Sequence, residues 1–254
     1  MRSLKLGTLV TLIALALLAG ACDNANFNMV IMYAVAPDAD TCDHQIQDSE
    51  SEFRFLSHGM IDLGHPIYGL PDVVPNYYIW MQVHNYTQNN GDDEVGRINS
   101  RDVMLQTVEV SYAWIRNESL LASDPYQLLR ALEDEDVSIP MSGMVGAAAS
   151  PDEPGRLLLG TGIIPHHLGS RLVTLADFAN DPDNLSQLVL GANIRVVGTT
   201  LGGTRVESTP LLFPIYFCFG CVSGGVCSDG VTPMEGCVPG QDGLNPESCP
   251  DDAT

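Results

Sequence analysis

The segment Val103–Ile115 constrains the fold more than any other part of the chain. From Val108 onward, apolar residues alternate with polar or small ones. Successive side chains of a strand point to opposite faces. The apolar face therefore carries Val108, Val110, Tyr112 and Trp114, and the other face carries Glu109, Ser111 and Ala113. One buried and one wet face is typical of an antiparallel sheet, so the sequence predicts an all-β fold.

Further strands are predicted from the same patterning and from β-branched and aromatic content. They are Phe27–Val35, Tyr77–Tyr86, Arg156–Ile164, Ala192–Thr200 and a return strand that begins at Thr204 and reaches Phe217. Gly202-Gly203 predicts a tight hairpin turn, and a phase change near Pro210 predicts a bulge. Residues 53–76, which contain three prolines, are expected to be irregular. Short helices are expected within 124–134 and 171–190. The predicted class is an antiparallel β-sandwich, with an immunoglobulin-like arrangement as one form of it.

The N-terminus has the pattern of an export signal. Arg2 and Lys5 precede an apolar run, Leu6–Leu18, which is too short to span a bilayer comfortably. Small residues and then Cys22 follow, and this segment resembles the lipobox of bacterial lipoproteins. The resemblance implies that Cys22 becomes a diacylated N-terminus that anchors the protein in a lipid membrane. An ordinary signal peptide, with a free Cys22, is the alternative, and the choice between inner and outer membrane stays open.

The chain is strongly acidic, with a formal net charge of −21 over 254 residues. Nucleic-acid binding needs a basic footprint, so the charge argues against it. Four regions are expected: a signal peptide (1–21), an N-terminal strand with an acidic loop (22–52), a β-sandwich core (53–217) and a Cys-rich tail (218–254) that has few large apolar side chains.

Seven cysteines leave six if Cys22 carries lipid: Cys42, Cys218, Cys221, Cys227, Cys237 and Cys249. In an exported protein, six cysteines indicate three disulfides, and their connectivity stays open. Five of the six belong to the tail and cannot all pair among themselves. Full oxidation therefore predicts that Cys42 bonds with one tail cysteine.

Predicted envelope lipoproteins of myxobacteria and their relatives are similar to this chain. Ala19–Cys22 and the segment from Gly198 to Cys221, a hairpin that leads into Cys-x-x-Cys, carry the resemblance. It implies an extracytoplasmic location in the cell envelope and a sandwich with a Cys-rich tail. It implies no activity.

The cysteine motif at the start of the tail has three interpretations. A redox dithiol at Cys218 and Cys221 would need a helix N-terminus to lower the thiol pKa, and here the motif follows a strand. Zinc ligation by Cys218, Cys221, Cys227 and Cys237 would need a second paired knuckle, which is absent. Structural disulfides are therefore expected.

Metal sites are not predicted elsewhere. His58 and His65 are isolated, and the adjacent pair His166-His167 suits a loop or surface better than a shared metal. Acidic segments at 89–94 and 181–184 lack the twelve-residue EF-hand spacing and are expected to be solvated.

Tyr78, Trp80 and Tyr86 line one face of a predicted strand, which is either a sugar-binding face or a half-buried second face of the sandwich. Common nucleophile, nucleotide and metalloprotease motifs are absent from the sequence. The sequence therefore predicts a non-enzymatic, lipid-anchored envelope protein with a structural or binding role and no cofactor. The alternatives are a glycan- or protein-binding module and an extracytoplasmic redox protein or other enzyme.

Overall fold

The computed structural model describes residues 28–38, 42–46, 55–65, 68, 70, 73–88, 99–116, 135–178, 189–218 and 241. The helix expected within 124–134, the acidic segments at 89–94 and 181–184, and five of the cysteines lie outside these described residues. Those cysteines are Cys22, Cys221, Cys227, Cys237 and Cys249.

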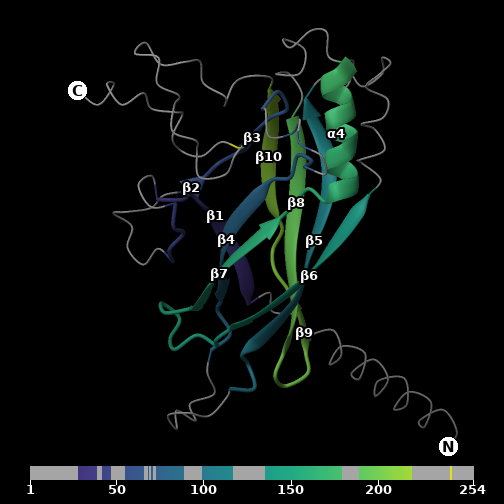
Figure 1. Ribbon diagram of the computed structural model, residues 1–254. Helices are drawn as coiled ribbons and strands as arrows, with labels where there is room; N and C mark the ends of the chain where they lie inside the picture. The colour runs from purple at the N-terminus through teal and green to yellow at the C-terminus, as the bar shows by residue number, and fades with distance from the viewer. Residues whose placement is uncertain are drawn as a thin grey trace, which may run out of the picture.

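Strands dominate the described residues, together with one helix (Figure 1). The strands are β1 (Met29–Val35), β2 (Phe55–Leu56), β3 (Gly59–Asp62), β4 (Tyr78–Asn85), β5 (Val103–Arg116), β6 (Asp136–Val145), β7 (Gly155–Gly162), β8 (Val189–Thr200), β9 (Arg205–Glu207) and β10 (Leu211–Cys218). The helix is α4 (His166–Phe178).

The strands form two sheets, and this confirms the predicted all-β sandwich. The small sheet has the order β2-β1-β4-β7, and all its pairs are antiparallel. The large sheet has the order β3-β10-β8-β5-β6, with β9 paired to β8. Its pairs are antiparallel except for β3 with β10, which run parallel. The immunoglobulin-like form of the sandwich stays a prediction.

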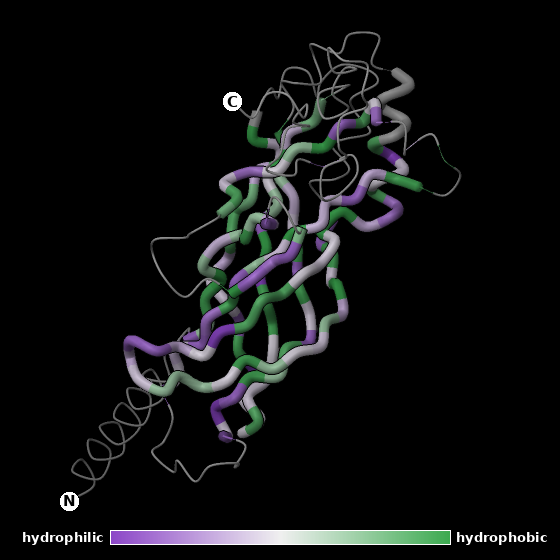
Figure 2. The backbone as a smooth tube through the Cα atoms, turned by 60° about the vertical axis from the view of Figure 1, so that its left-hand side comes forward, coloured by the Kyte–Doolittle hydropathy of each residue, from purple (hydrophilic) through white to green (hydrophobic). Residues whose placement is uncertain are grey.

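The core lies between the two sheets and follows the alternation seen in the sequence. On β4, Ile79, Met81 and Val83 are completely buried. On β5 the predicted inward face is also buried, with Val108 at 0 % exposure. Figure 2 shows the same alternation as hydrophobic and hydrophilic stretches along the strands. Tyr77, just before β4, packs on Phe213 of β10 with ring centroids 5.5 Å apart.

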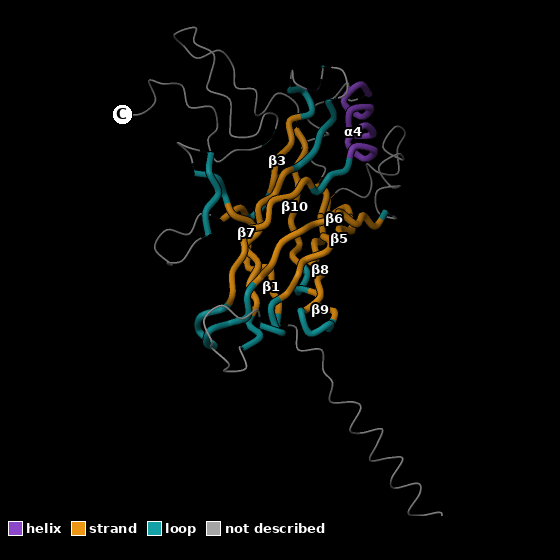
Figure 3. Tube along the Cα trace, turned by 60° about the horizontal axis from the view of Figure 1, so that its bottom comes forward, coloured by secondary structure: helices purple, strands orange, loops and turns teal. Residues whose placement is uncertain are grey.

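Helix α4 covers one end of the sandwich (Figure 3). It follows Pro165 and buries Leu168 and Leu172, which are each 1 % exposed. Gly169 allows the close approach, because a Cβ there would collide with the Pro75 carbonyl oxygen. The helix expected within 171–190 thus begins earlier, at His166, and the described part of it ends at Phe178.

Two sequence expectations were incomplete. Residues 53–76, expected to be irregular, contain β2 and β3. Residues 137–155 were not expected to hold a strand, yet β6 runs through Pro140. Because β6 is the edge of the large sheet, its Pro140 removes no hydrogen bond from a central strand.

Candidate functional site: a hollow on the large sheet

A hollow of about 350 Å³ lies on the outer face of the large sheet, which is the face turned away from the small sheet. Strands β5, β6 and β8 line it with Glu109, Val110, Ser111, Asp136, Val137, Ser138, Asn193 and Arg195. Its polar residues are the outward members of alternating strands whose other face builds the core.

Strand register aligns the polar residues in two rungs that run across the sheet. Ser111 on β5 pairs with Asp136 on β6 and with Asn193 on β8. One rung further along, Glu109 pairs with Ser138 and with Arg195. Paired residues of an antiparallel sheet share a face, so each rung is a row of neighbouring side chains. Because the Ser111 side chain at the centre is short, a depression remains between its longer neighbours.

Most of these polar groups are not engaged by the other residues that the structure describes. Among the described residues, no hydrogen bond or ion pair involves the side chains of Ser111, Asp136, Ser138 or Asn193. Asp136, Ser138 and Asn193 are exposed, and Ser111 is half-buried. The hollow therefore offers two hydroxyls, an amide and a carboxylate to a ligand, and none of them is held by a contact among the described residues.

On the second rung, the lining residues Glu109 and Arg195 belong to a network of alternating charges with Arg205 and Glu207 of β9. Arg205 Nη2 lies 2.9 Å from Glu207 Oε1 and 3.6 Å from Glu109 Oε1, and Arg195 Nη1 lies 3.5 Å from Glu207 Oε2. These four side chains are 32 to 64 % exposed, so each pair contributes little to stability. The network fixes the orientation of these side chains and leaves them with no net charge.

The aromatic row predicted on β4 is not an open face. Tyr78 is 52 % exposed and Tyr86 is 36 % exposed. Trp80, between them, is half-buried and stacks on His44 with a centroid distance of 4.7 Å. Burial lowers the pKa of His44, and the neighbouring Asp43 opposes that shift. The structure thus places Trp80 under another ring, whereas the tyrosines lie toward the two ends of the strand.

The middle of the same face is a buried polar pair. Gln82 is 1 % exposed and His84 is 6 % exposed, and Gln82 Nε2 lies 2.9 Å from His84 Nε2. His84 Nδ1 in turn lies 3.3 Å from the Tyr86 hydroxyl. Burial lowers the pKa of His84, and the charge of Arg156 lowers it further. This arrangement favours a neutral imidazole that satisfies its neighbours, which is a structural role.

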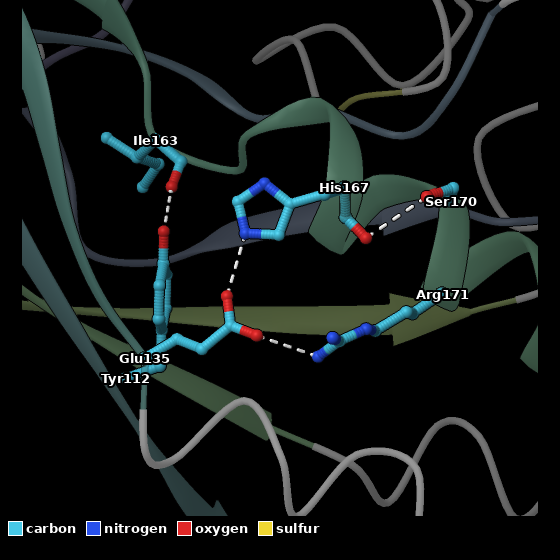
Figure 4. Close-up of polar contacts among 6 residues, drawn as sticks. All are labelled: Tyr112, Glu135, Ile163, His167, Ser170 and Arg171. Carbon is cyan, nitrogen blue, oxygen red and sulfur yellow. Dashed lines mark hydrogen bonds and ion pairs between the residues drawn. The ribbon is translucent and has the colours of Figure 1, made fainter.

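Glu135 joins helix α4 to the start of β6 (Figure 4). Its Oε2 lies 2.7 Å from His167 Nε2, and its Oε1 accepts a 2.8 Å hydrogen bond from Arg171 Nη1. Behind this cluster the buried Tyr112 hydroxyl donates to the Ile163 carbonyl. The hydrogen bond from His167 lowers the pKa of the Glu135 carboxyl below its ordinary value; desolvation opposes this shift and Arg171 reinforces it. The cluster clamps the helix against the sandwich.

We expect the Glu135→Gln variant to be less stable at neutral pH by about 0.5 kcal/mol, because a partly exposed ion pair contributes little. A carboxyl with a lowered folded-state pKa stabilises the fold above its unfolded pKa, and this contribution is lost as the pH falls through the folded value. The difference from the parent protein should therefore begin to shrink near the ordinary glutamate pKa of about 4.3 and should vanish only at a pH below the lowered folded pKa. Urea unfolding at several pH values measures it. Glu153→Gln, at an exposed glutamate, is the control, and an equal loss in both variants would contradict the clamp.

The histidines considered in the sequence are spread over the molecule. His166 and His167 are exposed, as expected, but they begin α4 and do not lie in a loop. His58 packs edge-on against Tyr216, and His65 against Tyr68. No three side chains of the metal-binding types gather within the described residues. The pKa of Tyr68 is raised to about 12 by burial and by Asp62.

Two cysteines lie in the described residues, and each is disulfide-bonded: Cys42 and Cys218. Cys42 adopts a left-handed backbone conformation with φ of 60°. Cys218 is the last residue of β10. The connectivity of the six predicted disulfide cysteines stays a prediction.

The sequence alone does not mark the residues of the hollow as a site. It predicts Ser111 and Glu109 on the outward face of their strand, which is the available signal. Asp136 and Ser138 were missed because β6 was not predicted. The pairing of β5 with β8, which brings Asn193 and Arg195 alongside, depends on long-range register.

No known protein-family model matches the chain, and none of the curated proteins is detectably similar to it in sequence. Within the described residues, no helix has both the length and the apolar character that a membrane crossing requires.

Proposed function

We propose that this chain is a lipid-anchored protein of the cell envelope that acts by binding and not by catalysis. The hollow on the outer face of the large sheet is the observation that carries the proposal. It combines a depression with four polar groups that no other described residue engages. Such convergent groups in a concavity are what a binding site requires.

The proposed anchor is an acylated Cys22. The basic residues, the apolar run and the small residues before this cysteine support it. Several acyl chains on one N-terminus make a stable anchor, since each buried methylene contributes about 0.8 kcal/mol. The acidic surface fits a domain held at a membrane without electrostatic adhesion to anionic lipids. The tethered sandwich would then present its hollow to the periplasm or the cell surface.

Intact mass and fractionation of the full-length protein test the anchor. The parent protein, with Cys22 in place, should appear in the membrane fraction with acyl mass on Cys22. The Cys22→Ser variant should appear in the soluble fraction. Peptide mapping without reduction shows which of the other cysteines form disulfides in the same sample. A soluble protein with an unmodified Cys22 would contradict the envelope assignment.

Binding is tested separately with the soluble Cys22→Ser protein and insoluble, purified cell-wall polysaccharide. We expect the protein to sediment with the polysaccharide. A version that also carries Ser111→Val should sediment at least about tenfold less well, a change of about 1.4 kcal/mol. Equal sedimentation of both versions would place binding somewhere other than the hollow.

A further inference from the structure

We infer that the hollow takes a neutral carbohydrate, a pyranose ring that lies across Ser111 with its hydroxyls on Asp136 and Asn193. This inference rests on the proposed binding function and specifies the class of ligand. It comes from the chemistry and register of the central rung and not from the aromatic row on β4.

The donors and acceptors of the central rung complement those of a sugar. A carboxylate only accepts hydrogen bonds, whereas an amide and a hydroxyl both donate and accept. The rung therefore offers acceptors at Asp136 and both donors and acceptors at Ser111 and Asn193. Adjacent sugar hydroxyls each need to donate and to accept, and this set satisfies both requirements.

The spacing of the rung matches a single ring. Neighbouring strands lie about 4.8 Å apart, so Asp136 and Asn193 rise from strands about 10 Å apart, with Ser111 between them. Their side chains flank the short serine from the two sides. The width between them suits one ring at a time, such as the end sugar of a polysaccharide, better than a chain laid along the sheet.

The rung also has an apolar neighbour. Leu212 on β10 pairs with Asn193 and continues the same row, and it is 60 % exposed. A sugar ring has an apolar face of C–H groups as well as its hydroxyls. The C–H face of the sugar can pack on the Leu212 side chain, and burying apolar area there contributes about 25 cal/mol per Å².

Charge distinguishes neutral sugars from other polar ligands. The lining residues Glu109 and Arg195 carry opposite charges, and so do their neighbours Arg205 and Glu207, so Asp136 leaves the hollow with one net negative charge. Phosphorylated or carboxylated ligands would be repelled by that carboxylate. Ammonium groups would be attracted to it but would gain less from the amide and the hydroxyls.

NMR titration of the soluble Cys22→Ser protein tests the inference. The probes are methyl α-mannopyranoside, methyl β-galactopyranoside and N-acetylglucosamine, with ethanolamine as the cationic probe and glucose 6-phosphate as the anionic one. We expect at least one neutral sugar to shift the amide signals of Ser111, Asp136 and Asn193. The affinity should be weak, with a Kd on the order of 1 mM.

Two matched variants test whether the signal shifts report binding in the hollow. Ser111→Val removes the central hydroxyl and fills the depression with a β-branched side chain that suits a strand. It should weaken binding at least tenfold. Ser142→Val makes the same change at an exposed position of β6 away from the lining residues, and it should bind as the parent protein does.

The other outcomes are equally decisive. Shifts with ethanolamine or glucose 6-phosphate alone would overturn the carbohydrate inference and would leave a binding hollow for a different class of ligand. Sugar-induced shifts at Tyr78 and Tyr86 in place of the hollow would overturn it too. The absence of signal shifts with every probe would overturn the carbohydrate inference. The mass of Cys22 and the fractionation test the envelope assignment independently.

Discussion

The Gly59→Ala variant is expected to lose about 3 kcal/mol of unfolding free energy, because its one added methyl group overpacks the core. Gly59 begins β3, at the edge of the large sheet. A Cβ added there would lie 2.5 Å from Cζ of Tyr77 and 2.8 Å from its hydroxyl oxygen. The Tyr77 ring cannot give way, because it is 1 % exposed and packs on Phe213. The new methyl group therefore has to push the two sheets apart. Urea unfolding measures the loss.

Two further proteins identify the cause of that loss. Gly146→Ala is the matched control, because a Cβ there meets nothing within 4 Å. Its stability should stay within about 0.5 kcal/mol of the parent. A double variant that combines Gly59→Ala with Tyr77→Leu should lose less than the sum of the two single changes, since the shorter side chain makes room. Additive losses would show that the contact between Gly59 and Tyr77 does not limit stability.

The long strands could be predicted because their faces differ in polarity. In β5 every second residue from Val108 to Trp114 is buried, as the alternation indicated. In β10 the apolar set of Phe213, Ile215 and Phe217 is likewise buried. The phase change before it is real: β9 ends at Glu207 and β10 begins at Leu211, and the Ser208 hydroxyl accepts a hydrogen bond from the Val196 amide between them.

The short and edge strands could not be predicted because tertiary pairing determines them. β3 has four residues and exists through its parallel pairing with β10, far along the chain. β6 does alternate, with Val137 and Ile139 packed against the core, but Pro140 and Gly143 mask the pattern. A proline is tolerated there only because the strand is an edge, and no local signal reports that position.

The candidate site was out of reach for the same reason. Ser111 is an ordinary outward residue until β6 and β8 are placed on either side of it. Serine, asparagine and aspartate on a wet strand face carry no motif, so their convergence is a property of register. The aromatic residues of β4 suggest a sugar-binding face in the sequence. In the structure, however, His44 stacks on the central Trp80.

Replacing Gln241 should cause the second large loss of stability, because this distant residue contacts both sheets. It is 4 % exposed, and its backbone forms a bridge with Ile61 of β3. Its side-chain oxygen accepts a 3.1 Å hydrogen bond from the Tyr78 amide, and its side-chain nitrogen donates to the Asn76 carbonyl. Gln241→Ala leaves both backbone groups without this partner, and the loss of a buried partner costs about 1 to 3 kcal/mol. We expect a loss of about 2 kcal/mol in urea unfolding and faster hydrogen exchange at the Tyr78 amide.

The chemistry of the replacement separates a hydrogen-bond role from simple contact. Gln241→Glu keeps an acceptor for Tyr78 but turns a charged oxygen toward the Asn76 carbonyl, so it should cost at least as much as alanine at neutral pH. Gln88→Ala makes the same truncation at an exposed side chain and should be close to neutral. If Gln241→Ala matches Gln88→Ala in stability and leaves the exchange at Tyr78 unchanged, this residue does not hold the sheets together. If the loss appears as expected, a residue beyond position 218 is part of the sandwich, because the β4 backbone depends on it for a partner.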